Sequence, residues 1–452
     1  MNTTRSCYNK MDDLNSEKIP NYIHYIMTPL KLVGCWEWYK NPEKEYQMII
    51  NNVYYALVLF VLINLQWSLV VNLYTEWTKV MDNLEKLADS FPLLVSIAVI
   101  VHFTYKKKRM YELVDFMNSN FKYHSARGLT NMTMFESYKS AKKFGYVYTA
   151  CTFFSISMYI CMPLLNYVWT KQPIQYWVYA DVTSATGFIV VFVRQCVGQI
   201  FVALAVGQLG VFFASNSILI CGQLDILCCS LRNVRYTALL LSAVQHRCIA
   251  VEYGDIVRDE EHSYMYNKAL LQDTEYHYDE KMKPALNRKD VDIYSAEYDM
   301  ATIAALKECA KMGQVIMQYI HKFERLVSPL LVIRVVQVTL YLCILLYAAS
   351  SKFDMVTVEY LAAVALDIFI YCYYGNQIII QADRVTTAAY QSAWPGAGAR
   401  ARRTLLNLLL AHRRPVHVRA GSFLTMDLRT FLIIIKTSFS YYTLLVNVNE
   451  NK

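Results

Sequence analysis

Seven long stretches of this 452-residue sequence are nearly free of charge. Lys, Arg, Asp and Glu almost vanish at roughly 47 to 75, 90 to 105, 144 to 170, 182 to 224, 326 to 351, 356 to 382 and 427 to 448. Most of these stretches reach the ~20 residues that a helix needs to cross ~30 Å of hydrocarbon. The second is short, so its outer turn must include the charged segment around Lys86 and Asp89. This pattern predicts an all-α membrane protein with seven transmembrane helices.

Enzyme signatures are also missing. The sequence contains no G-x-G-x-x-G, no G-x-x-x-x-G-K-[ST], no H-E-x-x-H and no G-x-S-x-G, so we expect no catalysis and no cofactor. Its twelve Cys have no regular spacing, no C-x-x-C pair and no cluster with His, which argues against a disulfide framework and a metal site. The N-terminus lacks a short apolar segment with a small-residue cleavage site, so we expect no removable signal peptide.

The basic residues are distributed unequally between the gaps that separate the apolar stretches. Of 44 Lys and Arg, 35 lie in the N-terminal segment and the gaps at 102 to 143, 225 to 325 and 383 to 426, and five lie in the other gaps and the tail. The positive-inside rule therefore predicts a cytosolic N-terminus and an outside C-terminus. Long loops obey this rule weakly, yet without 225 to 325 the balance is still 22 to five. The net charge of +8 then describes an inner face that meets anionic lipid, with no nucleic-acid partner.

The longest gap, from 225 to 325, begins and ends with segments of helical pattern. Segments 225 to 250 and 301 to 325 look helical, which predicts that the fourth and fifth spans continue well below the membrane. We expect these extensions to pack subunits together. The acidic, Tyr-rich stretch from Asp255 to Asp299 has little helical periodicity and predicts a solvated cytosolic loop.

Four ionisable residues interrupt the apolar stretches: Arg194, Arg334, Asp367 and Lys436. Such groups are costly in a bilayer and are candidates for function. Arg334 and Asp367 belong to consecutive antiparallel helices and could pair, although the span centres place them several residues apart in depth. The interpretations left open are structural pairing or snorkelling for each, and exposure of Asp367 or Arg194 to a ligand pocket or a water-filled cavity.

Four motifs stand in register over the last eighty or so residues. They are Tyr371-Cys372-Tyr373-Tyr374-Gly375-Asn376-Gln377 followed by Tyr390-Gln391-Ser392-Ala393-Trp394, then Arg413-Arg414-Pro415, then Ala420-Gly421-Ser422-Phe423, and finally the run from Lys436 to Leu445. In order and spacing they closely resemble the insect odorant receptors. The rest of the chain resembles this family in length and in its inverted seven-span plan.

The resemblance implies an odorant-gated, nonselective cation channel in the plasma membrane of an olfactory sensory neuron. Four subunits would surround one central pore, with odorant receptor co-receptor subunits as partners, a small volatile ligand, permeant cations and surrounding lipid. The implied organisation is a cytosolic N-terminal segment (1–46), helices 1–4 with most of the odorant pocket (47–224), an intersubunit anchor (225–325), helices 5–6 (326–382), a cytosolic segment (383–426) and a pore-lining helix 7 with the extracellular tail (427–452).

The last apolar stretch suits a pore helix. Thr425 and Asp427 supply N-terminal cap chemistry. Ser440, Leu444 and Asn447 recur at i, i+4 and i+7, so they form one stripe with an apolar ring and an amide ring around a fourfold axis. The alternative is that this face packs on a neighbouring helix, and Leu445 and Val448 replace the stripe if the helical phase differs by one.

The same stripe separates this chain from two relatives. The co-receptor and the gustatory receptors carry a Thr-Tyr pair and a Gln near the end of this helix, where this chain has Ser440, Tyr441 and Asn447. This difference favours a ligand-tuned receptor and leaves open whether the chain forms a pore alone.

The resemblance places the odorant pocket in the outer halves of spans two, three, four and six. One stripe from each span supplies the candidates, which are Leu84, Leu87, Phe91, Phe154, Met158, Cys161, Phe188, Phe192, Gln195, Thr357, Tyr360 and Val364. Aromatic and sulfur-containing walls suit a small apolar ligand held by burial and one or two polar contacts. Ordinary helix packing is the alternative at each position.

Three other functions remain as alternatives. A gustatory-receptor-like or self-sufficient homomeric channel would share the same fold. A metabotropic seven-helix receptor would need the opposite orientation, with an outside N-terminus. A secondary transporter usually shows internal repeats or interrupted spans, and neither is evident, although Pro92 and Pro163 could bend their helices.

Overall fold

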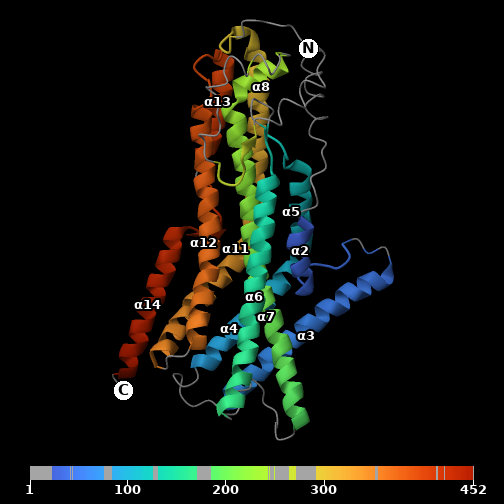
Figure 1. Cartoon of the computed structure of the whole chain (residues 1–452), viewed down its shortest axis with the longest axis vertical. Helices are drawn as coiled ribbons and strands as arrows, with labels where there is room; N and C mark the ends of the chain where they lie inside the picture. The colour runs from blue at the N-terminus through green and yellow to red at the C-terminus, as the bar shows by residue number, and fades with distance from the viewer. Residues whose placement is uncertain are drawn as a thin grey trace.

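A computed structural model describes residues 23–450 except 41, 43, 76–83, 126–130, 171–184, 243, 245–248, 250–263, 271–291, 352–354, 414–415 and 422. Within these residues the chain forms an elongated bundle of α-helices (Figure 1). The helices are α2 (Ile23–Leu32), α3 (Glu45–Thr75), α4 (Leu84–Tyr105), α5 (Lys107–Asn120), α6 (Phe135–Thr170), α7 (Ala185–Arg232), α8 (Val234–Leu241), α11 (Asp299–Ser351), α12 (Met355–Tyr390), α13 (Ala399–His412) and α14 (Leu428–Glu450), with a 3₁₀ turn η2 at Ala296–Tyr298.

Two short antiparallel ladders complete the described structure. Strand β1 (Asn131–Met132) pairs with β2 (Ala269–Leu270), and β3 (Arg419–Ala420) pairs with β4 (Leu424–Thr425). The second ladder turns at Gly421, whose φ of 64° is a left-handed conformation that glycine adopts without strain. Ser328 in α11 fixes this turn, because its carbonyl oxygen accepts from Gly421 N at 3.3 Å and its hydroxyl donates to Gly421 O at 2.9 Å.

Each predicted apolar stretch coincides with a long helix, namely α3, α4, α6, α7, α11, α12 and α14. Among the described residues, four of these helices are long and apolar enough to cross a membrane, at Glu45–Thr75, Ile189–Arg232, Ala296–Tyr347 and Val358–Tyr390. A shorter apolar helix runs from Asp89 to Tyr105. The composition and the helices identify a membrane protein.

Helices α7 and α11 are much longer than a bilayer requires. Their 48 and 53 residues extend about 72 and 80 Å at ~1.5 Å per residue, against ~30 Å of hydrocarbon. Both helices therefore continue past their apolar stretches in the described residues, and their position below a membrane stays a prediction. The continuation of α7 ends at Arg232, and α8 follows after Asn233. Figure 1 shows α8 and α13 at one end of the bundle, which we call the anchor end, and the end of α14 toward the opposite end.

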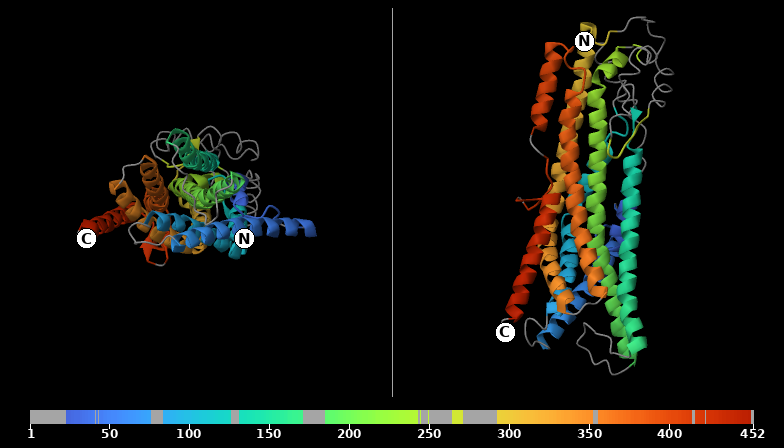
Figure 2. Two further views of the ribbon diagram at one scale, coloured as in Figure 1. Left: turned by 90° about the horizontal axis from the view of Figure 1, so that it is seen from below. Right: turned by 60° about the vertical axis from the view of Figure 1, so that its left-hand side comes forward.

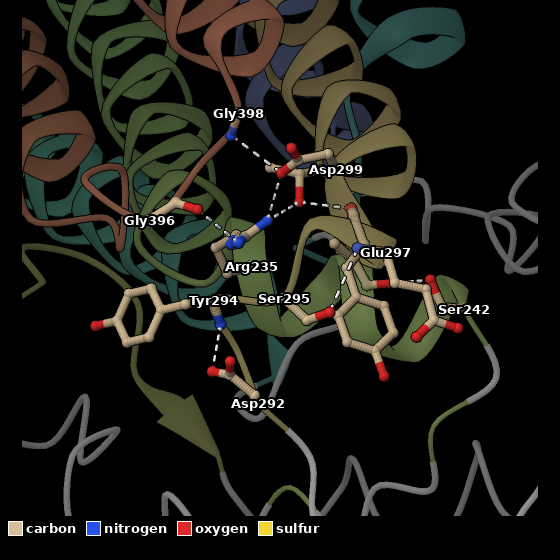
Figure 3. A network of polar contacts seen from close by, with 12 residues as sticks. Arg235, Ser242, Asp292, Tyr294, Ser295, Glu297, Asp299, Gly396 and Gly398 are labelled. Atoms are coloured by element: carbon tan, nitrogen blue, oxygen red, sulfur yellow. Dashed lines mark hydrogen bonds and ion pairs between the residues drawn. The ribbon is translucent and has the colours of Figure 1, made fainter.

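A buried arginine holds the anchor end together (Figure 3). Arg235 in α8 is 1% exposed. Its Nη1 donates to Asp299 Oδ1 at 3.2 Å and to Thr302 Oγ1 at 2.9 Å, and its Nη2 donates to the Gly396 carbonyl at 3.1 Å. Asp299 Oδ1 also accepts from Gly398 N at 3.0 Å. One guanidinium thus connects α8, the start of α11 and the segment before α13.

The predicted solvated loop is described at residues 264–270 and 292–299, and the first of these two parts packs against the bundle. The Asp225 carboxylate in α7 accepts from Tyr266 N at 2.9 Å, and buried Asn267 accepts from Ser137 Oγ of α6 at 2.8 Å. For these residues the expectation of a solvated loop is wrong, because backbone amides and one Asn side chain find partners on two helices. Residues 255–263 and 271–291 of that stretch lie outside the described structure.

Helix α7 forms the centre of the bundle. From Gln208 to Leu231 its side chains are buried, since it packs on α4, α6, α11 and α12, and a helix that is apolar all round suits such a position. Helices α3 and α14 diverge from the bundle on opposite sides, as the views in Figure 1 and Figure 2 both show. Both carry large exposed apolar side chains, among them Phe60 and Trp67 on α3.

Candidate functional site

A cavity of about 250 Å³ opens between five helices in the half of the bundle away from the anchor end. Helices α4, α6, α7, α11 and α12 all contribute to its wall. The lining residues are Asp89, Pro92, Leu93, Tyr148, Cys151, Thr152, Ser155, Ile156, Gln199, Val202, Ala203, Val206, Gly207, Arg334, Gln337, Tyr341, Tyr360, Ala363, Val364, Leu366 and Asp367. Most of this wall is apolar, with a few polar groups, which is the usual composition of a small-molecule site.

The polar part of the wall centres on an ion pair between α11 and α12. Arg334 Nη2 binds Asp367 Oδ2, and Arg334 Nη1 donates to Gln337 Oε1. Tyr148 of α6 donates its hydroxyl to Asp367 Oδ1 at 3.0 Å. Arg334 and Asp367 are 3% and 5% exposed, so each charge is compensated where water is excluded. The two residues pair although the span centres place them several residues apart in depth.

The structure combines the two interpretations that the sequence left open for Asp367, which is both paired and at the cavity wall. Arg194 does not line the cavity and instead contacts α3. Its Nη2 donates to Ser68 Oγ at 2.8 Å and so connects α7 to α3. Lys436 is exposed on α14.

Of the twelve candidate pocket residues, Tyr360 and Val364 line the cavity. Phe91 lies next to it, packed on the cluster of Tyr341, Ile344 and Leu345. Phe154, which is 68% exposed, and Cys161, which is also exposed, do not line the cavity. The half-buried candidates Leu87, Met158, Phe192 and Gln195 do not line it either. The side chains of Leu84, Phe188 and Thr357 lie outside the described structure.

These differences have one main cause, which is depth. On α7 the candidates span 188 to 195, whereas the lining residues span 199 to 207; on α4 and α12 the lining also lies closer to the anchor end. Periodicity fixes the face of a helix but not the depth of a void along it. The predicted stripe on α6 also lies on a different face of the helix from the cavity wall. Tyr148, Cys151, Thr152 and Ser155 line the cavity, and Phe154 does not.

The sequence reasoning missed the contribution of α11, which supplies Arg334, Gln337 and Tyr341. A signal for it was present. Arg334 and Asp367 are ionisable residues within apolar stretches, and such residues usually face the interior of a bundle or a polar cavity.

The predicted pore stripe lies on an exposed face of α14. Ser440, Leu444 and Asn447 are exposed in the single chain, Leu444 by 57%. The predicted cap is present, because Asp427 Oδ1 accepts from Thr430 N at 2.7 Å and the helix begins at Leu428. The alternative residues Leu445 and Val448 have side chains outside the described structure.

Helix α11 lies between the cavity and α14. Arg334 and Gln337 of α11 face the cavity, and one turn away the Thr339 carbonyl accepts from Ser438 Oγ of α14 at 3.2 Å. Helix α12 contacts the same helix, since the rings of Phe369 and Phe431 meet edge to face with centroids 5.4 Å apart. A displacement of α11 or α12 at the cavity would therefore be felt by α14.

The chain is similar to known proteins over most of its length. The family model described as "7tm Odorant receptor" matches residues 79–439. Odorant receptor 83a of Drosophila melanogaster is 24% identical over 343 residues, which cover 74% of this chain and 73% of that protein. The structure of the insect olfactory receptor OR5 from Machilis hrabei superposes with a TM-score of 0.70 at 16% identity, covering 95% of this chain and all of that one, and its complex with eugenol superposes with a TM-score of 0.69. Because the family model covers far more than half of the sequence, the chain belongs to the insect odorant receptor family.

Proposed function

We propose that this chain is a ligand-tuned subunit of an odorant-gated, nonselective cation channel. It acts in the plasma membrane of an olfactory sensory neuron, in a tetramer with odorant receptor co-receptor subunits around a single pore. All seven long helices cross the membrane, with the anchor end in the cytosol. The inequality of 35 to five in Lys and Arg supports this orientation.

The observation that carries the proposal is the cavity between α4, α6, α7, α11 and α12. Its volume of about 250 Å³ is below the ~300–1,000 Å³ of sites for drug-sized ligands, so it suits a small volatile molecule. Apolar side chains from four helices provide burial, and Tyr360 and Val364 supply wall from α12. The odorant binds here mainly through dispersion and the hydrophobic effect.

Gating follows from the position of α11. An odorant that binds the open arrangement better than the closed one shifts the equilibrium by that difference in affinity. The shift travels from Arg334 and Gln337 along α11 to the Thr339–Ser438 contact with α14. Helix α12 contributes in parallel through Phe369 and Phe431.

The exposed stripe of α14 lines the pore. Around a fourfold axis, Leu444 forms an apolar ring that closes the pore by dewetting, and Asn447 supplies amides that solvate cations. Ser440 adds a small polar group on the inner side. The exposure of Ser440 and Leu444 in the single chain supports the assignment, since a pore-lining side chain is not buried within its own subunit.

The test is two-electrode voltage clamp on oocytes that express this chain alone or with an insect odorant receptor co-receptor, screened against a broad panel of volatiles. Odorant-gated cation current only on co-expression is the expected result. Current from the chain alone would support the self-sufficient homomeric channel instead. Volatile-evoked second-messenger signals without channel current would favour a metabotropic receptor, and uptake of labelled ligand without such current would favour a transporter.

A further inference from the structure

Two basic side chains continue the exposed stripe of α14 toward the start of the helix. Arg429 and Lys436 are exposed in the single chain, as are Ser440, Leu444 and Asn447. At about 100° per residue, these five residues all fall within an arc of about 80° around the helix axis. The stripe that lines the pore under the proposed function therefore carries positive charge before it reaches Ser440.

The depth of Lys436 makes contact with lipid unfavourable. Lys436 lies eight residues after Leu428, where α14 begins, which corresponds to about 12 Å along the axis. In a helix that crosses ~30 Å of hydrocarbon, this depth lies inside the membrane, where a charge that faces lipid is costly. The opposite face of α14 is the buried one, with Ile434 and with Ser438 bonded to α11. Lys436 thus points away from its own bundle and needs water or an acidic partner.

The same helix in a second copy of the chain cannot neutralise Lys436. Within the part of the chain that the structure describes, Lys436 forms no ion pair. From Leu428 to Asn449 the sequence of α14 contains Arg429 and Lys436 but no Asp or Glu, so α14 of another copy offers no carboxylate at this depth. A water-filled pore solvates an ammonium group inside the membrane without requiring such a partner.

We propose that Lys436 lines the pore on the cytosolic side of Leu444, and that its charge reduces the passage of divalent cations more than that of monovalent cations. The inference rests on the proposed function, because it takes α14 as the pore helix. It adds a residue that determines ion selectivity. Lys436 lies eight residues before Leu444, about 12 Å along the helix, so its effect on selectivity is separate from the gate.

The charge of the permeant ion decides how strongly the ammonium group acts on it. In bulk water, a monovalent cation about 6 Å from one ammonium group is disfavoured about threefold. The interaction energy doubles for a divalent cation, which is then disfavoured about tenfold. Lys436 therefore lowers the permeability of Ca²⁺ relative to Na⁺ by about threefold. Rings of Lys or Arg in a pore favour anions and rings of Asp or Glu favour cations, which gives the sign of this effect.

The number of such charges depends on the composition of the tetramer. A homotetramer would carry four copies of Lys436 at one level of the pore, whereas a tetramer with co-receptor subunits carries fewer copies. The repulsion of cations grows with each copy, because like charges add their potentials. This dependence supports the expectation that odorant-gated cation current appears only on co-expression.

The test compares Ca²⁺ and Na⁺ permeability. The chain is co-expressed with an insect co-receptor, and reversal potentials of the current evoked by an active volatile of the broad panel are recorded from excised patches in Ca²⁺ or Na⁺ solution. Lys436→Gln should raise the Ca²⁺/Na⁺ permeability ratio about threefold, and Lys436→Arg, which keeps the charge, should preserve it. Arg403→Gln is the matched control, because it removes a positive charge from an exposed position on α13 and should leave the ratio unchanged.

A cysteine variant tests the position of the side chain directly. Lys436→Cys should raise the ratio, and 2-aminoethyl methanethiosulfonate on the cytosolic face of the patch should lower it again, because the reagent attaches an ammonium group at the same position. The unsubstituted chain, treated in the same way, controls for its own cysteines, of which Cys151 and Cys161 are exposed. This variant keeps the test decisive if Lys436→Gln fails to reach the cell surface.

The outcomes separate the two proposals. Volatile-gated current whose permeability ratio stays the same in Lys436→Gln, or in Lys436→Cys before and after modification, would place Lys436 against lipid or a neighbouring subunit. That result would overturn the selectivity inference while the odorant-gated function stands. If the chain reaches the surface with its co-receptor and no volatile of the broad panel evokes current, the proposed function is overturned, and the inference with it.

Discussion

One glycine determines how closely the last helix approaches the bundle. Gly375 in α12 faces the backbone carbonyl of Met426, two residues before α14, and a Cβ at this position would overlap that oxygen. Met426 is held in turn, since its N–H donates to the Val418 carbonyl at 2.9 Å and its side chain is buried. Because the contact joins the backbone of α12 to the backbone at Met426, neither side can move easily to make room for a larger side chain. This contact gives a physical reason for the glycine in the Tyr371–Gln377 motif.

Gly375→Ala should therefore destabilise the protein by about 1–3 kcal/mol, the usual cost of overpacking, and should reduce odorant-evoked current by displacing α14. The measurement is the melting temperature of the detergent-solubilised chain together with whole-cell current. Gly145→Ala is the control, because an added Cβ there meets Val211 Cγ1 at an ordinary 3.5 Å. Equal melting temperatures for the two variants would contradict the close-contact explanation.

At the scale of elements, the anchor end is held by buried polar contacts, whereas α14 exposes apolar side chains. The anchor end is tied internally, with Arg235 in contact with three segments that are far apart in sequence. Helix α14 carries large exposed apolar side chains on more than one face, namely Leu432, Ile433, Phe439, Tyr441 and Leu444. A base tied by buried contacts and a last helix with exposed apolar side chains suit a subunit whose pore helix moves while its base remains fixed.

Arg235→Ala should cost about 3 kcal/mol, because breaking one partner of a buried ion pair leaves the other without compensation. Arg235→Lys should be intermediate, since an ammonium cannot reproduce the planar fork that binds three groups. Thermal unfolding and surface expression measure both effects. Arg403→Ala removes the same side chain from an exposed position on α13 and should change neither quantity. A similar loss of stability in that control would show that the effect is not specific to the buried Arg235.

Leu444→Ser should raise the basal current of the co-expressed channel, because a polar ring wets more readily than an apolar one. Leu432→Ser is the matched control. Leu432 is equally exposed, at 56% against 57% for Leu444, but lies on another face of α14 by helical phase. An unchanged basal current with an intact odorant response in Leu444→Ser would argue against Leu444 as the gate and in favour of helix packing on that face.

At the scale of the whole molecule, two long helices set the shape. Helices α7 and α11 extend well past the thickness of a bilayer, and α8 and α13 pack at the end where they project (Figure 1). Three basic residues of the 383–426 gap, Arg400, Arg402 and Arg403, lie on α13 at this end. Fixed charge on one side and apolar surface along the opposite half together favour one orientation in the membrane.

Epitope tags at the two termini test this orientation. On unpermeabilised cells, antibody should reach a C-terminal tag and should reach an N-terminal tag only after permeabilisation. A surface-labelled membrane protein expressed in the same cells controls for leakage. Access to the N-terminal tag on intact cells would reverse the assignment and revive the metabotropic alternative.

The sequence by itself determined the helical class, the places of the seven long helices, the extensions of α7 and α11 and the family, because these depend on local hydropathy, helix length and motifs in register. The cap of α14 at Asp427 was also a local property. Tertiary structure alone decided which residues line the cavity. Its depth, the inward face of α6, the contribution of α11 and the pairing of Arg334 with Asp367 depend on how five helices meet. A void has no periodicity of its own, so no single stripe of side chains predicts where packing leaves space.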